Sequence, residues 1–158
     1  MLKSCCVTGH RDIPAVKVDL VKEELRKQIN MAIEDGYTHF ISGMADGVDL
    51  YFANIVSEIK SEKTGITLEA AIPYRNRLKT KNSLFQRLIK LCDSVHIVAE
   101  EYSKETFLSR NMYMVGKSER VIAVYDGRLK GGTDFTIRYA KTRNKEIHLI
   151  TVQKNIIR

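Results

Sequence analysis

Short apolar runs alternate with longer amphipathic segments along the whole chain of 158 residues. Lys3 to Thr8 is a short apolar run that stops at glycine, which is typical of a buried strand. Over residues 17 to 35 apolar side chains recur at helical spacing, and Gly36 follows as a suitable residue after a helix C-terminus. The same order of strand and then helix repeats along the rest of the chain. We expect further strands at residues 39–42, 66–72, 95–99, 120–125 and 147–152, and further helices at residues 48–59, 81–92, 104–117 and 134–144.

Six such repeats predict an α/β fold, because parallel strands need crossover helices to connect them. We expect a single domain over residues 1–158, with one doubly wound, mostly parallel, Rossmann-like sheet of about six strands and helices on both faces. Ligands of such sheets bind at the carboxyl ends of the strands, near the point where strand order reverses. The loops expected there are residues 8–13, 42–49, 73–82, 100–103 and 126–133.

Composition agrees with a soluble globular protein, with 44% hydrophobic and 28% charged residues. No uninterrupted apolar stretch reaches the roughly 18 residues of a membrane span, and the N-terminus lacks a secretory pattern, so we expect a cytoplasmic protein without a membrane partner. Cys5, Cys6 and Cys92 have neither a zinc spacing nor a disulfide framework. We therefore expect reduced, buried thiols and no metal site.

The net charge of +7 is concentrated in one segment. No acidic residue lies between Glu69 and Asp93, and six basic ones do: Arg75, Arg77, Lys79, Lys81, Arg87 and Lys90. Such a patch attracts nucleotides, nucleic acid or an acidic protein. The alternative is an ordinary solvated loop and helix face.

The turn "SGMADGVD", residues 42–49, follows the second strand and leads into a helix. Its glycines allow a ligand to approach the backbone, and a helix N-terminus presents free amides to an anion. The alternative is structural, with Asp46 as the N-cap and Asp49 as a carboxylate that favours the helix dipole.

The turn "GRLKGGT", residues 127–133, has the same position after the fifth strand. Gly131 and Gly132, followed by Thr133 as the expected N-cap, predict a second amide-lined concavity at the same edge of the sheet. Neither turn has the Walker pattern or the GxGxxG dinucleotide pattern.

Three other polar side chains are candidates for ligand contact. His10 and Arg11 follow the first strand, which we expect near the switch point, and a guanidinium can bind a phosphate with two hydrogen bonds. The alternative is that His10 caps a turn and Arg11 is exposed. Asn111 shares a helical face with Phe107 and Val115, so its amide points inward, to make either a structural hydrogen bond or a ligand contact. His39, His96 and His148 are most simply structural.

Taken in order, "TGHR", "SGMADGVD", "IPYRNR", "RNMYMV" and "VYDGRLKGGTDFTIRYA" resemble the SLOG superfamily of Rossmann-like proteins. The sequence is most similar to the YpsA-like branch, and more distantly to the Smf/DprA DNA-processing proteins and the Lonely Guy phosphoribohydrolases. The resemblance implies a nucleotide-derived ligand, such as an ADP-ribose or nucleoside phosphate, which the protein senses or sequesters, often in stress or conflict systems. No further cofactor is expected. The residues and the resemblance together predict these ligand-binding positions: Thr8, Gly9, His10, Arg11, Ser42, Gly43, Asp46, Gly47, Asp49, Arg75, Asn111, Asp126, Gly131, Gly132 and Thr133.

Two alternatives remain open. Lonely Guy enzymes, which cleave an N-glycosidic bond, have a glutamate a few residues after their Pro-Gly-Gly-x-Gly-Thr turn, and none follows Thr133 here. Asp46 or Asp49 is then the candidate catalytic carboxylate of a nucleotide hydrolase or transferase, with Asp126 and Asp134 as further substitutes.

The other alternative is DprA-like binding of single-stranded nucleic acid through the basic segment from Arg75 to Lys90. Such binding usually needs aromatic stacking platforms. The tyrosines are expected to be scattered without one: Tyr74, Tyr102, Tyr113, Tyr125 and Tyr139. A homo-oligomer is also expected, with Phe107, Met112 and Met114 on a contributing apolar face.

Overall fold

The computed structural model describes residues 3–152. Its strands are β1 (Ser4–Gly9), β2 (His39–Ser42), β3 (Thr67–Tyr74), β4 (Ser94–Ala99), β5 (Arg120–Tyr125) and β6 (Glu146–Thr151). Its helices are α1 (Val18–Glu34), α2 (Val48–Glu62), α3 (Ser83–Ile89), α4 (Thr106–Lys117) and α5 (Gly132–Thr142), with 3-10 turns η1 (Ala15–Lys17) and η2 (Arg75–Lys79). The predicted alternation of strands and helices is confirmed. α3 is shorter than expected because the side chain of Asn82 accepts a hydrogen bond from the Phe85 amide and caps the helix there.

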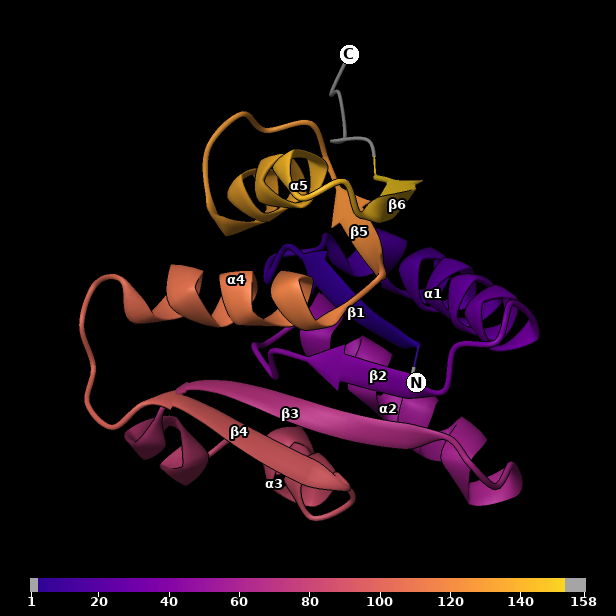
Figure 1. The fold of residues 1–158 in the computed structure, drawn as a ribbon, viewed down its shortest axis with the longest axis horizontal. Coiled ribbons are helices and arrows are strands. Elements are labelled where there is room, and N and C mark those ends of the chain that lie inside the picture. The colour runs from indigo at the N-terminus through magenta and orange to yellow at the C-terminus, as the bar shows by residue number, and fades with distance from the viewer. Residues whose placement is uncertain (1–2, 153–158) are drawn as a thin grey trace.

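The six strands form one sheet in the order β4-β3-β2-β1-β5-β6 (Figure 1). All neighbouring pairs are parallel, so the α/β, Rossmann-like prediction is confirmed and the sheet is parallel throughout. The chain builds outward from β1 through β2 and β3 to β4, then returns to place β5 on the other side of β1. Strand order therefore reverses between β1 and β5, and the loops that follow these two strands are neighbours.

Helices cover both faces of the sheet. α1, α2 and α3 pack on one face and α4 and α5 on the other (Figure 1). Successive strand residues point to opposite faces, so Cys5 belongs to the core under α1 and α2 whereas Cys6 belongs to the core under α4 and α5. All three cysteines are free, with Cys5 and Cys6 buried and Cys92 half-buried. Within residues 3–152, no helix has both the length and the apolar character that a membrane span requires.

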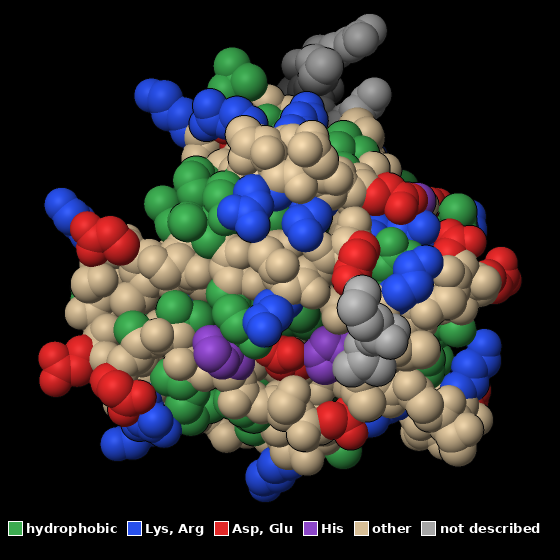
Figure 2. Space-filling view, in the orientation of Figure 1, with side chains coloured by type: hydrophobic (Ala, Val, Ile, Leu, Met, Phe, Trp, Pro, Cys, Tyr) green, Lys and Arg blue, Asp and Glu red, His purple; other side chains and the backbone are tan. Residues whose placement is uncertain are grey.

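The face that carries α4 also holds a half-buried polar cluster. Figure 2 shows two histidine side chains, in purple, on either side of an acidic one. His39 Nε2 lies 2.7 Å from Glu69 Oε1, and Tyr113 donates its hydroxyl hydrogen to Glu69. The His96 ring stacks on Tyr113 with centroids 3.9 Å apart. These contacts join β2, β3 and β4 to α4, so they agree with a structural role for both histidines.

The prediction of an apolar face for an oligomer interface is wrong for one of its three residues. Met114 is only 1% exposed because it packs into the core between α4 and the sheet, whereas Met112 is 40% exposed. Phe107 lies at the opening of a cavity described below. Oligomer formation stays a prediction.

Candidate functional site

The loops after β1 and β2 interlock at the carboxyl edge of the sheet. A Cβ on Gly9 would lie 2.5 Å from Cγ1 of Val48, so the absence of a side chain lets α2 approach β1. Gly47 has φ +83° and its missing Cβ would lie 2.7 Å from the carbonyl oxygen of Arg11. The Val48 amide donates to the His10 carbonyl oxygen at 3.4 Å. The lack of a side chain at Gly9 and Gly47 therefore allows the two loops to pack against each other.

The 42–49 turn uses its polar groups internally. The amides of Met44 and Ala45 donate to Ser42 Oγ and Asp49 Oδ2 at 3.1 and 3.3 Å, and Ser42 Oγ donates to the Asp49 carbonyl oxygen at 2.8 Å. The expected N-cap at Asp46 is wrong, because α2 begins after Gly47 without a side-chain cap. Asp46 is exposed and accepts a hydrogen bond from Asn82 Nδ2 at 3.0 Å.

The 127–133 turn leaves the amides at its end available, whereas the Arg128 amide donates to Asp126 Oδ1 at 3.1 Å. α5 begins after Gly131, which has φ +108°, and has no side-chain cap. The expected N-cap at Thr133 is wrong because Thr133 is already inside the helix and buried. Within the part of the chain that the structure describes, the amides of Gly132, Thr133 and Asp134 have no acceptor. Such a helix start attracts anions.

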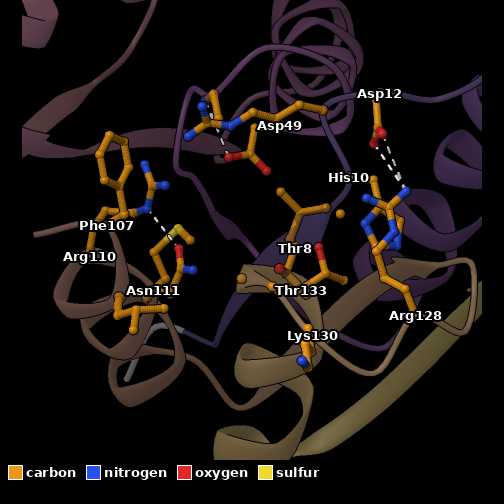
Figure 3. Close-up of a pocket in the computed structure, with 18 residues that line it drawn as sticks. Thr8, His10, Asp12, Asp49, Phe107, Arg110, Asn111, Arg128, Lys130 and Thr133 are labelled. Atoms are coloured by element: carbon orange, nitrogen blue, oxygen red, sulfur yellow. Dashed lines mark hydrogen bonds and ion pairs between the residues drawn. The ribbon is translucent and has the colours of Figure 1, made fainter. Parts of the chain in front are cut away.

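A cavity of about 450 Å³ opens at the switch point between β1 and β5. Figure 3 shows Phe107, Arg110 and Asn111 on one side of it, His10, Asp12 and Arg128 on the other, and Thr8, Thr133 and Lys130 between them. Nine predicted site residues line it: Thr8, Gly9, His10, Arg11, Asp49, Asn111, Gly131, Gly132 and Thr133. Six predicted site residues are not part of the lining: Ser42, Gly43, Asp46, Gly47, Arg75 and Asp126.

A buried charge pair supports one wall of the cavity. Arg110 is 4% exposed, and its Nη1 donates to the Gly43 carbonyl oxygen and its Nε to Asn111 Oδ1, the latter at 2.8 Å. Burial raises the pKa of Asp49, and the positive charge of Arg110 opposes this rise. A Cβ on Gly43 would lie 2.8 Å from both Arg110 Nη1 and Asp49 Oδ2. Gly43 therefore supports the cavity indirectly, by leaving room for this pair.

Arg128 forms the other wall. Its Nη2 donates to Asp126 Oδ2 at 2.6 Å and to Asp12 Oδ1 at 3.2 Å. The hydrogen bonds from Arg128 lower the pKa of Asp126 to about 2. The Asp126 amide donates to His10 Nε2 at 3.2 Å, and the His10 ring stacks on Tyr125. Asp126 therefore positions His10 and Arg128 from behind the cavity.

The charge that remains for a ligand is positive. Arg110 is balanced by the nearby Asp49, and Arg128 by Asp12 and Asp126. Arg11 and Lys130 also line the cavity, and neither forms an ion pair with a carboxylate among residues 3–152. The positive charge of Arg11 also opposes the rise in the pKa of Asp49, so this carboxyl is near both Arg110 and Arg11. Arg11 and Lys130 share the cavity with the available amides of α5.

Aromatic rings meet beside the cavity, which corrects the expectation of scattered tyrosines for Tyr74 and Tyr102, whereas Tyr113, Tyr125 and Tyr139 each contact a different ring elsewhere. The rings of Tyr74 and Tyr102 have centroids 5.4 Å apart, and that of Phe107 lies 5.9 Å from Tyr74. The Arg11 guanidinium carbon lies 5.3 Å from the Phe107 centroid. Spacing along the sequence does not show this cluster because its members come from three separate segments.

The basic segment is partly neutralised. Arg75 donates from Nε and Nη2 to Glu100 at 2.7 and 2.9 Å, which holds it at the surface outside the cavity. Arg87 donates to Asn54 Oδ1 at 3.0 Å, but this acceptor is uncharged, so the bond does not neutralise Arg87.

The sequence did not predict Asp12, Arg128 and Lys130 as residues that line the cavity. For Arg128 and Lys130, the one signal in the sequence was the basic run "GRLK" directly before Gly131 and Gly132.

No group of three or more His, Cys, Asp or Glu side chains is arranged to hold a metal ion within residues 3–152. Asp134 is also committed elsewhere, because it accepts a hydrogen bond from Tyr125 and pairs with Arg138 at 2.8 Å. Asp49 is therefore the one predicted catalytic carboxylate that lines the cavity.

The fold and the site together define a Rossmann-like α/β protein with a basic cavity at the switch point of a parallel sheet. The YpsA model, described as the YspA SLOG family, matches residues 5–155. The chain therefore belongs to the SLOG family of YpsA-like proteins.

Relatives of known sequence are UPF0398 proteins of Bacillus. Those of Bacillus thuringiensis (strain Al Hakam) and Bacillus cereus (strain AH187) are each 26% identical over 159 residues, which is 91% of this chain and 85% of the relative.

Two solved structures have the same fold. DNA processing protein A from Helicobacter pylori, studied for its single-stranded DNA binding mode, matches with a TM-score of 0.67 and 18% identity over 93% of this chain. The chain spans 64% of that protein's length. The structural genomics target TM1055 matches with a TM-score of 0.59 and 17% identity over 92% of this chain and 72% of its own.

Proposed function

We propose that the cavity binds a nucleotide-derived small molecule, a nucleoside phosphate or an ADP-ribose-like compound, and that the protein senses or sequesters it. One observation carries the proposal: the available amides of Gly132 and Thr133 open into the same cavity as Arg11 and Lys130. A phosphate there is bound by helix amides and by cations that form no ion pair with a carboxylate among residues 3–152. The cavity volume of about 450 Å³ is within the usual range of small-molecule sites, about 300–1,000 Å³.

Polar groups near the amides suit the sugar of such a ligand. Thr8, Asn111 and Thr133 line the cavity together (Figure 3). The Asn111 side-chain oxygen is occupied by Arg110, which leaves its amide nitrogen as a donor for a ribose hydroxyl. Binding fits this lining better than N-glycosidic cleavage. Asp49, the remaining candidate for catalysis, already accepts the Ala45 amide and faces Arg110.

The test is native mass spectrometry of freshly purified protein, followed by chromatographic identification of any released compound. We expect an intact nucleotide derivative that is lost in the Gly132→Asp variant, because a carboxylate at the start of α5 repels phosphate. A Cβ at Gly132 has room, since its nearest heavy atom, Asn111 Nδ2, lies 3.6 Å away. Gly116→Asp on the exposed side of α4 is the matched control, since no atom lies within 4 Å there.

Three outcomes of this test are distinct. Release of a free base from added nucleotide would instead support the hydrolase, with Asp49→Asn as its inactive variant. Protein that is purified empty and shows no thermal shift with a panel of nucleotides would contradict binding. A loss of ligand in Gly116→Asp as well as in Gly132→Asp would show that the effect is not specific to the helix start.

Single-stranded nucleic acid is a second candidate ligand. The aromatic rings of Tyr74 and Tyr102 lie together with arginines nearby, and the DNA processing protein A of Helicobacter pylori shares the fold. Base stacking on aromatic rings next to positive charge is how many proteins bind single strands. Fluorescence anisotropy with a labelled oligothymidylate tests this candidate. Binding that weakens steeply between 50 and 200 mM salt would support it.

A further inference from the structure

The cavity has an aromatic rim that the binding of a phosphate does not explain. Tyr74 ends β3, Tyr102 lies in the loop after β4, and Phe107 lies in the first turn of α4. The three rings meet edge to face, with interplanar angles of 66 to 87° and centroids 5.4 to 6.4 Å apart. Phe107 lines the cavity, and Tyr102 is 62% exposed. We call Arg11, Tyr74, Tyr102 and Phe107 the aromatic rim.

An edge-to-face cluster fixes the orientation of its rings, because each ring edge is held against the face of another. It also leaves one large aromatic surface open to solvent at Tyr102, although burial of that ring would be favourable. The uncovered face of a single ring held in this way is suited to the stacking of a planar ligand group.

Arg11 connects the rim to the cavity. Its guanidinium lies over the Phe107 ring at 5.3 Å, and Arg110 lies on the same ring at 5.9 Å. Arg11 is exposed and forms no ion pair with a carboxylate among residues 3–152. A guanidinium binds phosphate through its edge and stacks on aromatic or base rings through its face. Arg11 can therefore contact both the base and the phosphate of one molecule.

We propose that the aromatic rim binds a nucleobase, so that the cavity selects a nucleotide over a phosphate or a sugar phosphate. This inference rests on the proposed function, since it places the base of the same ligand. Phe107 and Arg110 lie on one side of the cavity, with Thr133 and Lys130 nearer its middle (Figure 3). The rim therefore receives the base while the phosphate binds at the start of α5, and the ribose spans the space between them.

The geometry favours a free nucleotide over a strand. Through Phe107 and Arg11, which line it, the rim adjoins a cavity with protein on both sides, formed by α4 on one and by Arg128 and Asp12 on the other. A single molecule with one base and one or two phosphates fits between them. A strand would have to continue past Arg128 and Asp12, whose ion pair lies at that end.

Isothermal titration calorimetry with ribose 5-phosphate, adenosine 5′-monophosphate and ADP-ribose tests the inference. We expect the two adenine compounds to bind about 5- to 100-fold more tightly than ribose 5-phosphate, the range that stacking on one base gives. Tyr102→Ala, outside the cavity lining, is expected to remove most of this difference and to leave the affinity for ribose 5-phosphate within about twofold of the native value. Phe107→Leu is expected to weaken the two adenine compounds more than ribose 5-phosphate. Tyr51→Ala, on α2 outside the cavity, is the matched control.

The outcomes separate the two proposals. Equal affinity of the native protein for all three compounds would overturn base binding by the rim and leave the proposed function standing. An equal loss of affinity for all three compounds in Phe107→Leu would have the same meaning. Tyr102 is largely exposed, so its variant remains informative if Phe107→Leu unfolds at a lower temperature. No binding of any compound would overturn both. Binding of oligothymidylate alone, weakened by Tyr102→Ala, would assign the rim to a strand and overturn the small-molecule function.

Discussion

Arg128 donates hydrogen bonds to both carboxylate oxygens of Asp12, at 3.2 and 3.4 Å, across 116 positions of sequence. This pair joins the loop after β5 to the loop after β1 at one end of the cavity. Both partners are at least one-third exposed, so the bond itself adds little to stability. Its larger consequence is electrostatic, since a carboxylate there neutralises a cation that an anionic ligand could otherwise use.

We predict that Asp12→Asn strengthens the binding of adenosine 5′-monophosphate by about three- to tenfold, because it removes a negative charge from the cavity and leaves Arg128 with one carboxylate partner, Asp126, instead of two. Calorimetry at two salt concentrations measures this change. Asp19→Asn in the first turn of α1 alters the net charge equally and is expected to change affinity less than twofold. Equal gains in both variants would mean that only the overall charge matters.

The acid stability of the protein is expected to depend on Asp126. Its pKa is lowered to about 2 in the folded state, so its contribution is complete above the ordinary value of 3.8 and is lost as the pH falls toward 2. Asp126→Asn should cost about 2 kcal/mol of unfolding free energy at pH 6 and progressively less below pH 4. Urea unfolding at pH 6, 4, 3 and 2.5 measures the difference. A cost that stays constant over this range would contradict the role of its charge.

Gly47 is expected to tolerate a side chain far less than Gly65 does. Both have positive φ, but a Cβ on Gly47 meets the Arg11 carbonyl oxygen at 2.7 Å, whereas nothing lies within 4 Å of one on Gly65. Gly65→Ala should cost about 1 kcal/mol from backbone strain alone, and Gly47→Ala about 3 kcal/mol or more, since overpacking is added. Denaturant unfolding of both variants checks this. Similar costs would show that the two loops can move apart.

The thiols are expected to react slowly in the folded protein. Burial raises the pKa of Cys92 to about 11 and that of Cys6 to about 12, and it raises the pKa of Cys5 as well. Iodoacetamide at pH 7.5 should modify Cys92 first, and Cys5 and Cys6 only after unfolding in urea, because the thiolate is the reactive form. Mass spectrometry of the peptides gives the order. Fast labelling of Cys6 without denaturant would contradict its burial.

The fold was largely predictable from the sequence, for reasons visible in particular elements. β1 was expected near the switch point because it is the first strand of a doubly wound sheet, and it lies between β2 and β5, where the strand order reverses. Helix starts were predicted less well. Asp46 and Thr133 have the residue types of N-caps, but each helix begins after a glycine, because Gly47 and Gly131 adopt positive φ just before it.

The candidate site was predictable only in part. The pattern of glycines after strands indicated the right loops, and Gly131, Gly132 and Asn111 do line one cavity. It did not show that amides of the 42–49 turn donate hydrogen bonds to side chains of the same turn, nor that Arg75 forms an ion pair with Glu100. Those outcomes depend on contacts between side chains and on which groups remain unpaired.

The sequence by itself determined the order of strands and helices, the parallel sheet and the edge of the sheet at which the cavity lies, because these follow from local periodicity and the geometry of crossover connections. The tertiary structure decided which charges line that cavity. It places Arg110 near Asp49, pairs Arg128 with Asp12 and Asp126, and leaves Arg11 and Lys130 beside the amides of α5. It also gathers Tyr74, Tyr102 and Phe107 into one cluster. Ion pairs and ring contacts depend on distances in space between residues that are far apart in the chain, and the pattern of residues along the sequence does not predict those distances.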